Sequence, residues 1–162
     1  MGNRFNSSNV EPSDDAPFLG AGGMYTLKVE QCKFQPGKDG RKSYVVEFEV
    51  VESQAVEPDA IVNAPGTKAV YVNKVGRFPN ALDAWDRANL EFVCGLMGYD
   101  FATEGPEIAE AIIPQVDKLL DQSIDMGKFV GLVVKCKTFQ KPGKTFTNHK
   151  WIPVRRHEPT VA

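Results

Sequence analysis

The order in which two hydrophobic periods follow one another along this chain constrains its fold most strongly. Tyr25, Leu27 and Val29 alternate with polar residues, and a period of two is typical of a β-strand. The alternation returns in residues 44–51 and again in residues 68–74. It then gives way to a helical period and comes back twice near the C-terminal end. The sequence therefore predicts a mainly β chain of five strands, with helices inserted after the third.

Turn-forming residues separate the predicted strands. Residues 35–42 contain two glycines and a proline, which favours a hairpin between the first two strands. Residues 52–67 are polar and contain prolines, so they are expected to form a long loop. Residues 140–144 form a second hairpin turn, between the last two strands.

In the second strand, Tyr44 and Phe48 share a face with valines and are expected in the core.

Two helices are predicted between residues 80 and 125. Asn80 is a candidate N-cap for the first, and Gly98 is placed to end it. A second helical stretch runs over residues 106–121, where Pro114 is expected to break or kink it.

Charge is divided very unevenly along the chain. The protein has 19 Lys and Arg residues against 21 Asp and Glu residues, a formal net charge of −2. The helical insert, residues 80–125, is acidic, since only Arg87 and Lys118 are basic there. The stretch between Met126 and His157 holds no acid, and the rest of the chain has a net charge of −10. The bases of this stretch are Lys128, Lys135, Lys137, Lys141, Lys144, Lys150, Arg155 and Arg156.

Aromatic residues lie among these bases. Lysines neutralise phosphates and aromatic faces stack on bases, so the combination is typical of single-strand nucleic-acid binding. The alternative is a well-hydrated hairpin, since a run of like charges is often only a solvated face.

Size and composition limit the remaining options. A chain of 162 residues with 42% hydrophobic content fits one domain with a real core. We expect a flexible N-terminal arm over residues 1–22, a folded domain over 23–154 and a short tail over 155–162. No segment is apolar enough for a membrane helix or signal peptide, so a cytoplasmic protein that does not bind membranes is expected.

Metal and enzyme chemistry are not expected. The three cysteines are far apart and predicted to be reduced core residues, and the two histidines have no neighbours that would complete a metal site. Phosphate-binding, serine-hydrolase and zinc-protease motifs are absent from the sequence, so no catalytic residue, cofactor or metal is predicted.

Five strands with a helix after the third is the element order of the OB-fold barrel, which binds oligonucleotides on its strand faces and loops. We therefore expect a five-stranded OB-fold-like barrel with the helical insert between strands three and four. An SH3-like barrel or a small sandwich is the alternative, although a helical insert of this size fits them less well.

Three segments resemble the single-stranded DNA-binding proteins of tailed bacteriophages. They are GMYTLKV at residues 23–29, GRKSYVVEF at 40–48 and FTNHKWIP at 146–153. The resemblance implies an OB-fold protein that coats single-stranded DNA in replication or recombination, in the host cytoplasm, without chemistry of its own. It also implies replication or recombination proteins as further partners, and a homodimer as one option. Many such proteins end in an acidic recruiting tail, which this chain lacks; the acidic insert is a candidate substitute.

The predicted DNA site combines basic and aromatic side chains. If Val70 and Val72 face the core, Tyr71 faces outward and can stack on a base. Trp151 is predicted equally as a core residue or as a stacking one. The expected phosphate contacts are Arg41, Lys42, Lys74, Arg77, Lys135, Lys137, Lys141, Lys144 and Lys150, and the expected stacking residues are Tyr71, Phe139, Phe146 and Trp151. The alternative function is a phage structural or assembly protein whose acidic insert docks on a basic partner.

Overall fold

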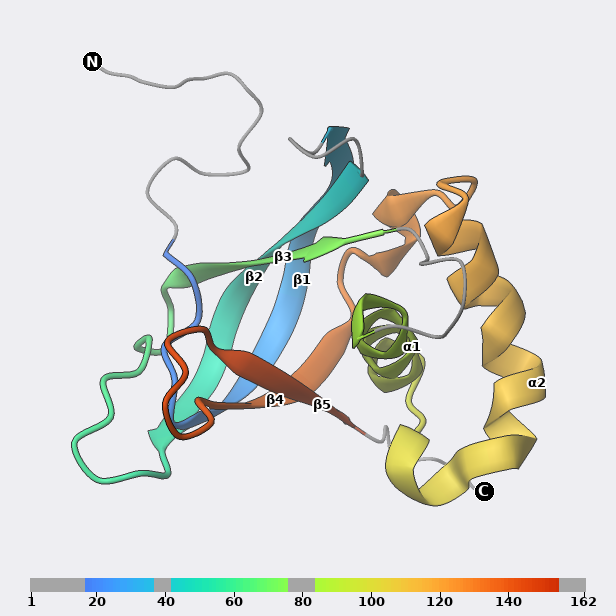
Figure 1. Ribbon diagram of the computed structural model, residues 1–162. Coiled ribbons are helices and arrows are strands. Elements are labelled where there is room, and N and C mark those ends of the chain that lie inside the picture. The colour runs from blue at the N-terminus through green and yellow to red at the C-terminus, as the bar shows by residue number, and fades with distance from the viewer. Residues whose placement is uncertain (1–16, 37–41, 76–83, 155–162) are drawn as a thin grey trace, which may run out of the picture.

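The computed structural model describes residues 17–36, 42–75 and 84–154, which form one five-stranded antiparallel sheet and two α-helices (Figure 1). This is the predicted mainly β organisation, with the helices after the third strand. The strands lie in the order β3-β2-β1-β4-β5. The elements are β1 (Gly23–Pro36), β2 (Lys42–Ala55), β3 (Lys68–Lys74), α1 (Ala84–Leu96), α2 (Phe101–Leu120), the 3-10 helix η1 (Met126–Phe129), β4 (Val133–Phe139) and β5 (Asn148–Pro153).

Strand β1 is the centre of the sheet. It pairs with β2 along its whole length, and its first part pairs with β4 on the other edge. The β1–β2 register shifts twice, between Thr26 and Leu27 and between Val29 and Gln31. Such bulges bend a strand and increase its twist, which helps the sheet to curve.

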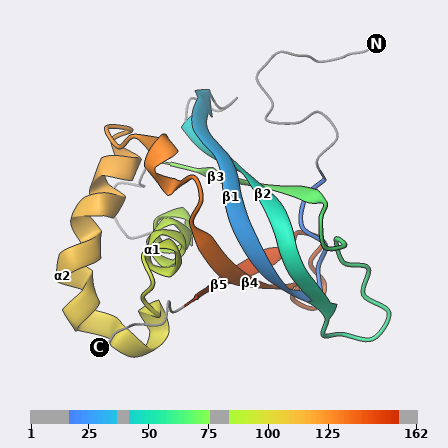
Figure 2. The ribbon, with the colours of Figure 1, turned by 180° about the vertical axis from the view of Figure 1, so that it is seen from behind.

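The sheet is not closed into a barrel by hydrogen bonds. Strands β3 and β5 are its two edges, and no ladder joins them in the part of the chain that the structure describes. Helix α1 contacts both β3 and β5, and α2 packs on the side of α1 that faces away from the sheet (Figures 1 and 2).

A buried polar contact fastens α1 to the sheet. The Asn89 side-chain oxygen accepts hydrogen bonds from the Tyr44 hydroxyl and from Asn73 Nδ2, both at 2.8 Å. Asn89 Nδ2 donates to the Lys74 carbonyl at 3.2 Å. Three polar groups that would be costly to bury alone are therefore satisfied together.

The helix ends agree only in part with the prediction. Gly98 does end α1: its φ is +92°, and the Tyr99 N–H donates to the Cys94 carbonyl at 2.9 Å. Asn80, the expected N-cap, lies outside the described residues. Pro114 does not interrupt α2 as expected. Both it and Glu110, one turn earlier, are exposed, so water can bind the carbonyl that proline leaves without a donor.

Residues 17–22, which were assigned to the flexible arm, are bound to the sheet. The Val70 N–H donates to the Pro17 carbonyl at 2.9 Å, and Thr138 Oγ1 donates to the Gly20 carbonyl at 2.6 Å. Leu19 is 2% exposed and belongs to the core. The predicted end of the flexible arm at residue 22 is therefore wrong. One large apolar side chain and a few hydrogen bonds to the backbone suffice to order residues 17–22.

The sequence also made predictions about core residues, cysteines and membrane helices. Tyr44 and Phe48 are fully buried, as predicted from the strand period. The three cysteines are free and buried. No helix in the described residues is both long and apolar enough to cross a membrane.

Candidate nucleic-acid interface

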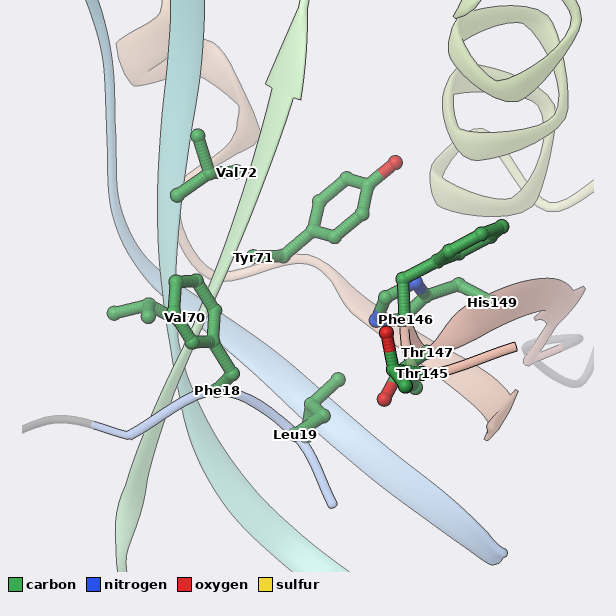
Figure 3. Close-up of a pocket in the computed structure, with 9 residues that line it drawn as sticks. All are labelled: Phe18, Leu19, Val70, Tyr71, Val72, Thr145, Phe146, Thr147 and His149. Atoms are coloured by element: carbon green, nitrogen blue, oxygen red, sulfur yellow. The ribbon is translucent and has the colours of Figure 1, made fainter. Parts of the chain in front are cut away.

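Tyr71 points into the molecule, so the prediction that it faces outward is wrong. Its side chain is only 6% exposed, whereas Val72 is 39% exposed. In the β2–β3 ladder Tyr71 lies directly opposite Val46, a core residue, and opposed strand residues share a face. Val70 is buried as well, but on the other face, beneath Phe18 (Figure 3).

Trp151 is likewise a core residue and not a stacking surface in this structure. It is 3% exposed, and its ring centroid lies 4.9 Å from Tyr71 and 4.8 Å from Phe92 of α1. The rings meet edge to face, the arrangement that aromatic pairs favour. Residues Tyr44, Tyr71, Phe92 and Trp151, here called the aromatic cluster, fill the space between β3, β5 and α1.

A groove lies on the solvent side of this cluster, between β3 and the β4–β5 hairpin. It consists of two adjoining pockets of about 350 and 460 Å³, which share five lining residues. The smaller pocket ends at Phe18 and Leu19, and the larger at Asn73 and Ala88. Figure 3 shows Tyr71 projecting from β3 on one side and Phe146 with His149 on the other. The shared residues are Tyr71, Val72, Phe146, Thr147 and His149.

Phe146 is the exposed aromatic side chain of this groove. It is 59% exposed, and it stands on the loop between β4 and β5. The loop is held by its own hydrogen bonds: Gln140 Nε2 donates to the Thr145 carbonyl and the Lys144 N–H to the Lys141 carbonyl, each at 3.0 Å. Phe146 is therefore presented by an ordered loop, and a planar group entering the groove would meet its ring.

His149 lines the same groove and was not among the predicted site residues. Its ring lies 4.8 Å from that of Tyr71 and is nearly parallel to that of Trp151. Burial lowers the pKa of His149 from 6.5 to about 4, so the imidazole is neutral at neutral pH. The sequence did hold a signal, because His149 and Trp151 are two residues apart on one strand and share a face.

The outer face of β4 and β5 is basic. Lys135 and Lys137 point outward together, as predicted, and neither forms an ion pair with an acid in the described residues. Lys150 of β5 lies directly opposite Lys137, and both are exposed. Lys28 of β1 also points outward, but Glu49 of β2 lies directly opposite it. Residues Lys135, Lys137 and Lys150 are here called the basic face.

The hairpin loop joins the basic face to the groove. Lys141 and Lys144 are exposed on this loop, next to Phe146. Phe139 is half-buried on the outer side of β4, opposite Asn148. One acid does reach the end of the hairpin: Glu91 of α1 interacts with Lys150, and burial raises the pKa of that carboxyl. The predicted residues from 135 to 150 thus lie together on one hairpin.

Other predicted residues lie elsewhere. Lys42 is exposed at the start of β2, and Lys74 is half-buried at the end of β3. Lys74 pairs with Ser43, the neighbour of Lys42, so the two lysines lie close together. They are at the end of β3 that is farther from the hairpin loop. Arg41 and Arg77 lie outside the described residues.

Comparison with protein-family models finds no match, and comparison with curated proteins finds none either. In the described residues, no group of three His, Cys, Asp or Glu side chains is arranged to hold a metal ion. The geometry of the groove and its basic hairpin is therefore the basis for a functional proposal.

Proposed function

We propose that this protein binds single-stranded DNA with little sequence preference, as a phage replication or recombination protein built on an open OB-type barrel. The observation that carries the proposal is the β4–β5 hairpin. It combines an exposed aromatic ring in a groove, Phe146, with exposed lysines along a segment that contains no acid. One hairpin therefore provides binding groups for both phosphates and bases.

The sheet order supports an OB-type barrel. An OB barrel has five strands and is partly open, and here β3 and β5 are the two edges left to meet. Their side chains do approach each other: the Tyr71 ring lies 4.8 Å from His149 and 4.9 Å from Trp151. We propose that contacts between these rings close the barrel in place of a hydrogen-bonded ladder. The groove then lies between β3 and β5, where the barrel closes.

The pair of Lys137 and Lys150 supports phosphate binding. Like charges directly opposite each other in a sheet are destabilising. A phosphate between the two ammonium groups would replace this repulsion with attraction. Because such contacts involve the backbone of the nucleic acid, they add affinity without choosing a sequence.

The position of Phe146 supports base stacking. A base that stacks on an aromatic side chain contributes on the order of 1–3 kcal/mol, and every base offers a face for it. With Phe146 on the groove and lysines on both flanks of its loop, a strand of DNA could pass along the hairpin with bases turned inward. Tyr71 and Trp151 would then support the groove from beneath.

The test is a titration of dye-labelled oligo-dT, followed by fluorescence anisotropy at several salt concentrations. We expect Lys135→Ala combined with Lys137→Ala to weaken binding and to reduce the salt slope by roughly 0.7 for each phosphate that is no longer neutralised. The matched control is Lys118→Ala with Lys128→Ala, which removes two charges from the helical side. Equal salt slopes for the two double variants would refute binding on the basic face.

A further inference from the structure

Backbone hydrogen bonds show which residues of β3 direct their N–H and carbonyl groups at the groove. The N–H of Val75, just after β3, donates to the Lys42 carbonyl of β2 at 2.8 Å. The Val70 N–H points away from β2 and donates to the Pro17 carbonyl at 2.9 Å. Because these directions alternate along a strand, the backbone groups of Val72 also point away from β2, on the edge that borders the groove.

Val72 is the open position of this edge. The Val70 N–H is already bonded, the Lys74 N–H donates to Asn73 Oδ1 at 3.0 Å, and the Lys74 carbonyl accepts from Asn89 Nδ2 at 3.2 Å. In the described residues no hydrogen bond reaches the N–H or the carbonyl of Val72, although Val72 lines both pockets of the groove. The edge therefore offers one donor and one acceptor on a single residue.

His149 is the corresponding position on the opposite wall (Figure 3). The Gly22 N–H donates to the Thr138 carbonyl at 2.9 Å, so the backbone groups of Thr138 point toward β1 and those of Phe139 toward β5. Phe139 pairs with Asn148, so the backbone groups of His149 point away from β4, toward the groove that His149 lines. Within the described part of the chain they too have no hydrogen-bond partner.

A single donor and acceptor suit a nucleobase better than a peptide. An extended peptide adds to a sheet edge through a row of backbone groups, and here the positions on both sides of Val72 are already bonded. The Watson–Crick edge of a base, in contrast, carries a donor next to an acceptor in all four bases. Pockets of about 350 and 460 Å³ also have room for a ring of this size.

We propose that Val72, with His149 across the groove, binds unpaired bases at their Watson–Crick edges through backbone groups. This inference rests on the proposed function and gives it a basis for strand selectivity. In a duplex the same edge is occupied by the opposite strand, so only a single strand can offer it. Since every base has both a donor and an acceptor there, the contact does not select a sequence.

The test compares three oligonucleotides of equal length on the full-length protein: oligo-dT, oligo-dU, and oligo-dT in which every base is N3-methylthymine. The methyl group on N3 removes the donor and blocks the Watson–Crick edge, whereas oligo-dU, the control, keeps that edge. We expect oligo-dU to bind like oligo-dT and the methylated strand to bind about 5–150-fold more weakly, the range for a lost two-bond contact to a base.

The outcomes separate this inference from the proposed function. Equal affinities for methylated and unmodified oligo-dT would overturn the inference and leave single-strand binding intact. If oligo-dT itself does not bind, the proposed function fails and the inference fails with it.

A second measurement assigns the contact to Val72. Val72→Pro removes the N–H without breaking the ladder, because that N–H points away from β2. Val72→Ala is the matched reference that keeps the N–H. We expect Val72→Pro to bind oligo-dT more weakly than Val72→Ala, and the two to bind the methylated strand equally; equal affinities for oligo-dT would contradict the contact.

If Val72→Pro does not fold, ¹H–¹⁵N spectra of the wild-type protein decide. The Val72 amide signal is expected to shift when oligo-dT is added, and to shift less with the methylated strand. Equal shifts with the two strands would overturn the inference.

Discussion

The aromatic cluster and the loop of the β4–β5 hairpin lie side by side, and each includes an aromatic side chain, yet their surroundings differ completely. Tyr71 and Trp151 are enclosed by other aromatic rings, whereas Phe146 stands in solvent between lysines. The comparison shows that ring content does not identify a binding surface. For the rings on strands, cross-strand register decides it, because the residue opposite Tyr71 or Trp151 on the neighbouring strand shares its face.

The strongest test of this contrast is Tyr71→Ala. A buried aromatic removed from a core costs about 3–5 kcal/mol, and here four neighbouring rings pack against the one that is removed. We expect the free energy of unfolding, measured by urea denaturation, to fall by that amount. Phe146→Ala, the matched exposed position, should change it by less than about 0.5 kcal/mol. If Tyr71→Ala changed the free energy of unfolding as little as Phe146→Ala, Tyr71 would not be a core residue and the contrast between the two regions would be wrong.

The second test uses pH, since His149 lies on the boundary between the two regions. Because its pKa is lowered from 6.5 to about 4, the unfolded chain binds a proton more readily than the folded one. Stability should therefore be fully present above pH 6.5 and fall as the pH drops toward 4, by up to about 2–3 kcal/mol. Thermal melts at pH 7 and pH 4.5 measure this loss. His149→Phe should make the loss smaller; an equal loss would assign it to other groups.

The third test concerns binding at the hairpin. Replacing Phe146 with leucine keeps an apolar side chain but removes the ring, and replacing it with tyrosine keeps the ring. Leucine is expected to cost on the order of 1–3 kcal/mol of oligo-dT affinity, because stacking is lost. Tyrosine should bind nearly as well as the wild type. Similar affinities for the two variants would mean that Phe146 does not stack.

The smallest effect is expected for Lys137→Gln. Removing one member of the Lys137–Lys150 pair relieves repulsion and should raise the free energy of unfolding by about 0.2–1 kcal/mol, while weakening oligo-dT binding. Lys135→Gln is the control, because Lys135 lies opposite Ile152 and should give no such gain. Equal changes in unfolding free energy for the two variants would show that the opposed lysines do not repel each other measurably.

Much of the fold could be predicted from local patterns. The five strands, the helical insert and the Gly98 helix end each depend on neighbouring residues in the sequence. The outward direction of Lys135 and Lys137 could also be predicted, because they alternate with the apolar Val134 and Cys136 in β4.

The direction of Tyr71 could not be predicted in this way. Apolar residues occupy both faces from Ala69 to Val72, so the period alone does not say which face is buried. Pairing with Val46, more than twenty residues earlier, decides it. The burial of Leu19 depends in the same way on distant partners. Such long-range pairing is not contained in a local pattern.

The pairing of β1 with β4 has a consequence for the way the chain is made. Residues 24–28 bond to residues 133–137, so this part of the sheet needs a strand that emerges from the ribosome more than a hundred residues later. Until then the β1–β2–β3 meander exposes one open edge of β1, and open edges invite pairing with other chains. Contacts between residues so far apart in sequence also slow folding. The acidic helices are synthesised in this interval, and their negative charge would keep neighbouring nascent chains apart while the last hairpin is completed.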